Sequence, residues 1–185
     1  IKRETGLLLG VQVLAAANRE ALAVAHACGA EFVRVEGFVF AHVADEGPIA
    51  SSAAELLRYR RTIGAEGVRV FADIKKKHSS HAITADVSLA ETARAAEFFL
   101  ADGVVVTGPA TGTTAERGDV SEVVRGCTLP VLVGSGLTPR NLGDYAHAHG
   151  YIVGSSVKQG GVWSNPLDPD AVRAMAQAFS ALPRE

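Results

Sequence analysis

The sequence has few cysteines, no long hydrophobic run and no excess of basic residues. Among its 185 residues are two cysteines, 18 Lys and Arg residues and 20 Asp and Glu residues, which give a net charge of −2. Nucleic-acid-binding domains usually carry a basic patch, so we expect no nucleic-acid partner. A membrane span needs about 18 consecutive apolar residues, and we expect no membrane span because no such run occurs. Cys28 and Cys127 form no Cys-x-x-Cys motif, so we expect free thiols in a reducing, cytoplasmic compartment.

Hydrophobic residues make up 48% of the chain and charged residues 21%, values that are ordinary for a globular protein. The length suits one domain, and we assign residues 1–185 to a single domain. Short runs of apolar and β-branched residues recur at 7–13, 32–35, 68–74, 104–107, 130–133 and 151–153. Most are continuously apolar rather than alternating, which is typical of strands buried on both faces of a parallel sheet.

Segments with helical periodicity separate these runs, and residues that favour helix starts precede them. The start signals are Asn18, Ser52, Ser88 with Glu91, Thr138 before Pro139, and Asp168 before Pro169. Ser88 and Glu91 have the spacing of a capping box, and a proline stands at the first helical position in the last two cases. The chain is therefore predicted to repeat a βα unit along its whole length.

Alternation of strands and helices allows two architectures, an open doubly wound sheet or a closed barrel. Polar residues capable of chemistry follow almost every predicted strand, as they do at the face of a barrel where all the βα loops meet. We therefore predict an α/β fold of the (β/α)8 TIM-barrel type with parallel strands, and the open sheet remains the alternative. A closed barrel has eight units and the sequence shows six. We expect about two N-terminal units to be missing, because residues 1–5 resemble the end of a helix.

Two glycine-rich turns follow the last two predicted strands. Gly134-Ser135-Gly136 follows the run 130–133, and Gly154-Ser155-Ser156 follows the run 151–153. Glycine allows a close approach of the backbone to a ligand, and exposed N–H groups, with a helix N-terminus at Thr138, attract an anion. Paired turns after the last strands form the usual phosphate site of these barrels. The turns therefore predict a small phosphorylated ligand, although tight turns without a ligand have the same pattern.

The segment 73–81 begins at the end of the third predicted strand and carries the residues best suited to proton transfer. Asp73 and Lys75 stand two apart at the strand end, so we expect both to point into the barrel mouth, with His78 as a further acid or base. A desolvated lysine there could instead form a Schiff base. Asp73, His78 and His81 are candidate ligands for a divalent metal, and the sequence leaves open whether one is needed.

Other polar residues near the strand ends are expected to support the site. They are Gln12 near the end of the first run with Asn18 after it, Arg34 and Glu36 at the second, and Thr107 with Gly108 at the end of the fourth. A charge inside so apolar a strand is costly unless it is paired or functional, so Arg34 and Glu36 form either a buried ion pair or part of the site. Gly108 is assigned to phosphate binding with the two turns. Lys76 is expected in a solvated loop, and Lys77 is as readily solvated as functional.

Five motifs in this order resemble the BtpA/SgcQ family. They are Glu55-Leu-Leu-Arg58-Tyr59-Arg60-Arg61, Asp73-Ile-Lys75-Lys-Lys77-His78, Val106-Thr107-Gly108, Val133-Gly134-Ser135-Gly136 and Ile152-Val-Gly154-Ser155. The resemblance covers essentially the whole chain and implies a phosphate-binding (β/α)8 barrel that begins with two further βα units. The family takes its name from a cyanobacterial protein implicated in photosystem I biogenesis, and another member lies with carbohydrate-metabolism genes. The resemblance thus implies a fold and a site rather than a substrate.

Two kinds of function fit these observations. The first is an enzyme with aldolase, isomerase or hydrolase chemistry on a small phosphorylated metabolite, and the second is a non-catalytic factor for photosystem I biogenesis or protein-complex stability. Charges clustered at strand ends reduce stability and have no structural role that would explain them, which favours the enzyme. Asp73-Ile-Lys75 is also similar to the Asp-x-Lys-x-x-Asp motif of the orotidine-phosphate decarboxylase superfamily, but His78 replaces its second Asp. A homo-oligomer is left open.

Overall fold

The sheet at the centre of the molecule contains six parallel strands. A computed structural model describes residues 1–183, and its strands pair in the order β1-β2-β5-β7-β8-β9. They are β1 (Gly10–Val11), β2 (Phe32–Val35), β5 (Arg69–Ile74), β7 (Gly103–Thr107), β8 (Val131–Gly134) and β9 (Gly150–Ile152). Each predicted apolar run overlaps one of these strands.

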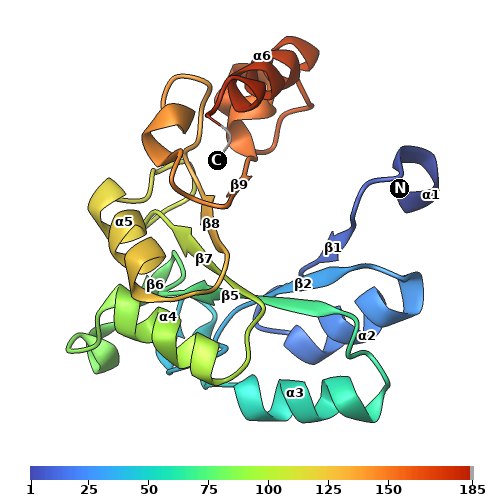
Figure 1. Cartoon of the computed structure of the whole chain (residues 1–185), viewed down its shortest axis with the longest axis vertical. Coiled ribbons are helices and arrows are strands. Elements are labelled where there is room, and N and C mark those ends of the chain that lie inside the picture. The colour runs from blue at the N-terminus through green and yellow to red at the C-terminus, as the bar shows by residue number, and fades with distance from the viewer. Residues whose placement is uncertain (184–185) are drawn as a thin grey trace.

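The sheet is strongly curved and forms an arc of a barrel, with α1 (Lys2–Thr5) and α6 (Pro169–Ser180) near its opposite ends (Figure 1). The strands pair in chain order with no reversal, whereas a doubly wound sheet reverses at a switch point. The prediction of a barrel-type fold is therefore confirmed over an open doubly wound sheet. Because all six strands are parallel, their carboxyl ends lie together along one rim of the curved sheet, which we call the mouth.

Helices cover the convex face of the arc. They are α2 (Asn18–Cys28), α3 (Ala53–Thr62), α4 (Leu89–Phe98) and α5 (Arg117–Gly126). Their apolar sides contribute fully buried residues such as Leu22 and Leu56 to the core. The predicted capping box of Ser88 and Glu91 starts α4, and Asp168 accepts two backbone N–H bonds at the start of α6. Among the described helices, none has the length and apolar character that crossing a membrane requires.

The segment after β8 differs from its prediction. Thr138 and Pro139 start no α-helix, and the chain instead forms the 3₁₀ turn η2 (Leu142–Tyr145). The Asn141 side chain accounts for this, because its Oδ1 accepts the N–H of Thr138 at 2.7 Å and its Nδ2 donates to the carbonyl of Gly136 at 3.0 Å. These bonds hold a turn and occupy the N–H that was expected to attract an anion. The prediction of a helix N-terminus at Thr138 is therefore wrong.

A second, antiparallel sheet lies beyond the mouth end of β2 and β5. It consists of β3 (His42–Ala44), β4 (Gly47–Ile49) and β6 (Ser79–Ser80), in the order β4-β3-β6, and the 3₁₀ turn η1 (Ala82–Thr84) follows it. β3 and β4 belong to the loop after β2, while β6 belongs to the loop after β5. The sheet therefore ties together the two loops that carry most of the charged candidate residues.

Glycines make room for aromatic rings on the face of β2 and β5 that also carries Arg34 and Asp73. The rings of Phe32 and Phe71 meet edge to face, with centroids 5.6 Å apart. A Cβ atom on Gly10 would lie 2.0 Å from the ring of Phe32, and one on Gly103 would lie 2.4 Å from the ring of Phe71. Neighbouring strands thus set a glycine against an aromatic side chain beneath the mouth.

We expect Gly103→Ala to lower the free energy of unfolding by about 1–3 kcal/mol, because the added methyl group overlaps the ring of Phe71. Urea denaturation measures the change. Gly118→Ala in α5 is the matched control, because no atom lies within 4 Å of its added Cβ and alanine favours a helix. Equal losses of stability in the two variants would contradict this role of Gly103.

Candidate functional site

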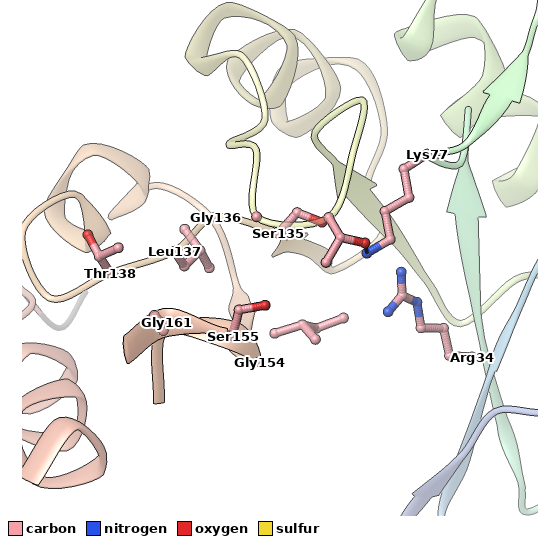
Figure 2. A pocket seen from close by; sticks show the side chains of 13 residues that line it. Arg34, Lys77, Ser135, Gly136, Leu137, Thr138, Gly154, Ser155 and Gly161 are labelled. Carbon is pink, nitrogen blue, oxygen red and sulfur yellow. Dashed lines mark hydrogen bonds between the residues drawn. The ribbon is translucent and has the colours of Figure 1, made fainter. Parts of the chain in front are cut away.

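A cavity of about 300 Å³ opens at the carboxyl ends of β8 and β9. Both predicted glycine turns line it. Residues Ser135, Gly136, Leu137 and Thr138 come from the first turn, and Ile152, Gly154, Ser155 and Ser156 come from the second. Arg34 and Lys77 reach toward it from the opposite side (Figure 2). They are the charged residues among the described lining, so the cavity is electropositive.

The backbone of the two turns leaves N–H groups available at the cavity. Gly136 has a φ of +61°, and a Cβ there would lie 2.6 Å from the backbone nitrogen of Thr114, so a side chain would not fit. The N–H groups of Gly136, Ser155 and Ser156 donate to no acceptor among the described residues. The hydroxyl oxygen of Ser156 is also buried without a hydrogen-bond partner among these residues. An oxyanion in the cavity would supply the missing acceptor.

Two glycines assigned to phosphate binding do not line this cavity. Gly134 is the last residue of β8, and a Cβ there would lie 3.4 Å from the methyl group of Thr107. Gly108 packs against the loop that follows β7, because a Cβ there would lie 2.0 Å from the carbonyl oxygen of Thr113. The structure therefore gives Gly108 a packing position, and the Thr107 hydroxyl beside it is buried without a partner among the described residues.

Arg34 and Glu36 do not pair with each other. The Arg34 Nε lies 3.0 and 3.2 Å from the two carboxylate oxygens of Asp73 on the neighbouring strand, and its Nη2 lies 3.0 Å from one of them. Glu36 instead accepts from Lys76 Nζ at 3.4 Å. Burial raises the pKa of Asp73 above its usual value, and the Arg34 guanidinium opposes this rise. The contact with a permanent cation thus offsets part of the cost of burying the Asp73 carboxylate at the mouth.

Polar residues from the first βα unit hold Glu36 in place. The Asn18 side chain donates to the carbonyl of Glu36 at 2.7 Å and accepts its N–H at 3.2 Å. The carboxylate accepts the N–H of Ala16 at 3.1 Å and lies 3.5 Å from the amide of Gln12. Gln12 and Asn18 are therefore brought to the mouth, where Asn18 fixes the backbone of Glu36 rather than capping α2.

Lys75 lies away from the cavity that the glycine turns form. Its φ of +47° breaks the alternation of side chains that β5 would otherwise continue past Asp73. Its Nζ consequently donates to the carbonyl of Thr84 at 3.2 Å, at the end of η1. The expectation that Asp73 and Lys75 point together into the mouth is therefore wrong, because the backbone turns between them.

The next two lysines occupy the mouth. Lys76 is buried, and its Nζ lies between the carboxylates of Glu36 at 3.4 Å and Glu46 at 3.5 Å. The expectation of a solvated Lys76 is wrong, because these carboxylates compensate for its burial. Lys77 extends into the cavity, and its Nζ donates to the hydroxyl of Thr111 at 3.2 Å. The run of three lysines signalled this cluster, but the sequence did not indicate which of them faces the cavity.

The histidines divide between the mouth and the second sheet. His78 Nε2 lies 3.0 Å from the Thr111 hydroxyl, whereas His81 Nε2 lies 3.0 Å from the carbonyl of Lys76. The ring of His81 packs against that of His42, whose pKa is lowered by burial and by His81. Among the described residues no three potential metal ligands of the His, Cys, Asp or Glu type cluster together, so metal binding by Asp73, His78 and His81 stays a prediction.

A second cavity of about 270 Å³ adjoins the first and contains the acidic groups. Arg34, Lys77 and Thr111 line both cavities. The carboxylates of the second cavity belong to Glu36, Asp45, Glu46 and Asp73. The mouth therefore has an electropositive end suited to an anion and an end where carboxylates, lysines and His78 can exchange protons.

The model of the BtpA family matches residues 1–181 of this chain. A Caenorhabditis elegans protein described as uncharacterized and mitochondrial is 50% identical over 177 residues, which are 96% of this chain and 64% of that protein. The Photosystem I biogenesis protein BtpA of Synechocystis is 35% identical over 174 residues, which are 93% of this chain and 60% of that protein. The chain thus spans less than two thirds of the length of these relatives.

Solved structures with the same architecture have very different sequences. Thiamine phosphate pyrophosphorylase from Pyrococcus furiosus superposes with a TM-score of 0.63 at 15% identity, covering 99% of this chain and 72% of that one. KGPDC from Streptococcus mutans gives a TM-score of 0.62 at 12% identity, covering 98% and 76%. At these identities the likeness shows the fold alone, which is that of a TIM barrel.

We expect Lys76→Met and Lys77→Met to affect stability very differently. Removing Lys76 leaves the buried carboxylate of Glu36 without its cation, so the free energy of unfolding should fall by about 3–5 kcal/mol. Lys77 has no carboxylate within 4.0 Å among the described residues, and its replacement should leave the melting temperature unchanged or higher. Thermal and urea unfolding of both variants test this, and similar losses would contradict the assignment of Lys76 as the structural lysine.

Proposed function

The chain belongs to the BtpA family, and we propose that it is an enzyme acting on a small phosphorylated metabolite, such as a sugar phosphate or a nucleotide. The phosphate would lie against the N–H groups of Gly136, Ser155 and Ser156. Arg34 would face it across the cavity and compensate for its charge, and Lys77 lies beside Arg34. A volume of about 300 Å³ suits a ligand of this size.

The buried hydroxyl of Ser156 is the observation that carries the proposal. A buried polar group without a partner costs about 1–3 kcal/mol, so folded proteins retain few of them. Ser156 lines a cavity whose described charged groups are cations, its oxygen is buried without a described partner, and free N–H groups belong to the same turn. An anionic ligand would satisfy all of these groups together.

Proton transfer would take place at the acidic end of the mouth. Burial raises the pKa of Asp73, which brings the carboxyl group closer to the range in which it can both accept and donate a proton. His78 lines the same cavity and has a second nitrogen free for a further proton transfer. Aldolase, isomerase and hydrolase reactions fit this arrangement, and Lys75 has no part in it because its amine binds the carbonyl of Thr84.

A non-catalytic role in photosystem I biogenesis is the alternative that the name of the Synechocystis relative raises. The nematode protein, an animal relative, is more similar to this chain than the cyanobacterial one is, at 50% against 35% identity. Animals have no photosystem, so a function shared by these relatives would lie outside photosynthesis. The paired charges and unpaired donors of the mouth also favour catalysis over a scaffold.

We expect Ser156→Ala to weaken the binding of ribose 5-phosphate and inorganic phosphate by about 10-fold or more, because a hydrogen bond to a charged acceptor contributes about 1.5–3 kcal/mol. The melting temperature of the ligand-free variant should not fall, since the hydroxyl has no partner to lose. Isothermal titration calorimetry measures the affinities.

Ser121→Ala is the matched control, because Ser121 lies on α5 and its hydroxyl contacts His147 at 3.1 Å, away from the cavity. Its affinity for ribose 5-phosphate should equal that of the unmodified protein. Ribose, which lacks the phosphate, should bind neither the unmodified protein nor the two variants. Binding of ribose 5-phosphate that is unchanged by Ser156→Ala, or absent from the unmodified protein, would overturn the phosphate site.

A further inference from the structure

Three consecutive lysines follow β5, and the structure gives each a different environment. The amine of Lys75 donates to the carbonyl of Thr84. The amine of Lys76 is buried between two carboxylates. The amine of Lys77 has no carboxylate within 4.0 Å among the described residues, and its recorded partner is the neutral hydroxyl of Thr111. Only Lys77 of the three lines the cavity formed by the glycine turns.

The surroundings of Lys77 lower the pKa of its amine and so ease the loss of its proton. Burial lowers the pKa of Lys77, and the nearby guanidinium of Arg34 lowers it further, whereas Asp73 and Glu36 oppose the shift. Figure 2 shows the Lys77 amine pointing toward the space between Arg34 and the glycine turns. An ammonium ion cannot act as a nucleophile, so a lysine near another cation and without a carboxylate in direct contact is the kind that reacts through its lone pair.

We propose that Lys77 forms an imine with the carbonyl carbon of a phosphorylated aldehyde or ketone, whose phosphate lies against the N–H groups of Gly136, Ser155 and Ser156. This inference rests on the proposed function and names the class of its substrate. One molecule can satisfy both ends of the cavity, because the glycine turns bind its phosphate while Lys77 faces its carbonyl group.

The chemistry needs no group beyond those present. The Nζ lone pair attacks the carbonyl carbon, and a proton moves from nitrogen to the carbonyl oxygen to give a carbinolamine. Proton transfer to its hydroxyl releases water and leaves the C=N bond of the imine. Asp73 and His78, which line the adjoining cavity with Lys77, are the groups available to donate and recover these protons. The imine withdraws electrons from the neighbouring carbon, which assists cleavage of a carbon–carbon bond or removal of a proton there.

Borohydride reduction tests the proposal, because hydride addition converts the imine to a stable secondary amine. The protein is incubated with glyceraldehyde 3-phosphate, or with glyceraldehyde as the unphosphorylated comparator, and sodium borohydride is added. The expected product carries the mass of the aldehyde less one oxygen, and tryptic peptides should show it on Lys77 with cleavage blocked there. We expect at least tenfold more adduct with the phosphorylated aldehyde, and inorganic phosphate should reduce it.

Lys77→Arg and Lys75→Arg form a matched pair of variants. Arginine retains the positive charge but does not form an imine, so Lys77→Arg should lose the adduct. Lys75→Arg should keep it, because arginine can still donate to the carbonyl of Thr84. Lys77→Met is a second variant in case arginine does not fit, and the melting temperature of each variant verifies its folding.

The outcomes separate this inference from the proposed function. If inorganic phosphate raises the melting temperature but no adduct forms, or the adduct lies on another lysine, the imine at Lys77 is wrong and the phosphate site stands. If glyceraldehyde reacts as well as its phosphate ester, the substrate class is wrong. If phosphate has no effect on stability and no adduct forms, the proposed function fails with the inference.

Discussion

Arg34 and Asp73 carry opposite charges on neighbouring strands of a largely apolar sheet, and either charge alone would be costly to bury there. Their contact has two consequences for the mouth. It fixes the end of β5 beside the end of β2, from which the loops that build the second sheet continue. It also sets a permanent cation at the boundary between the two cavities, so that one is electropositive and the other contains the acids.

The left-handed backbone of Lys75, directly after Ile74, determines how the lysines are used. Continued alternation along β5 would direct Lys75 to the same side as Asp73. The positive φ of Lys75 shifts this pattern, so that Lys76 meets Glu36 and Lys77 reaches the glycine turns. A local change in backbone conformation thus separates a structural lysine from one with an available amine, although all three have the same side chain.

The sequence predicted the six parallel strands because most of them are continuous apolar runs, and runs of this kind depend little on tertiary context. The search for apolar runs did not predict β3, β4 and β6, because these strands are short and polar and are defined by pairing between distant loops. In the candidate site, the glycine turns were predictable because their chemistry is local. The positions of Lys75 and Lys76 were not, because they depend on one backbone angle and on carboxylates about 30 and 40 residues away.

The polar and charged groups of the mouth differ in whether the protein itself supplies their hydrogen-bond partners and counter-charges. Glu36 and Lys76 have their partners within the protein, and the cluster around them gives the mouth its shape. The Ser156 hydroxyl and the Lys77 amine are less well satisfied, since the first has no described partner and the second lacks a counter-charge. Selection for stability alone would favour apolar residues at both positions. Their location on opposite sides of one cavity is explained if a single ligand, anionic at one end and electrophilic at the other, completes both.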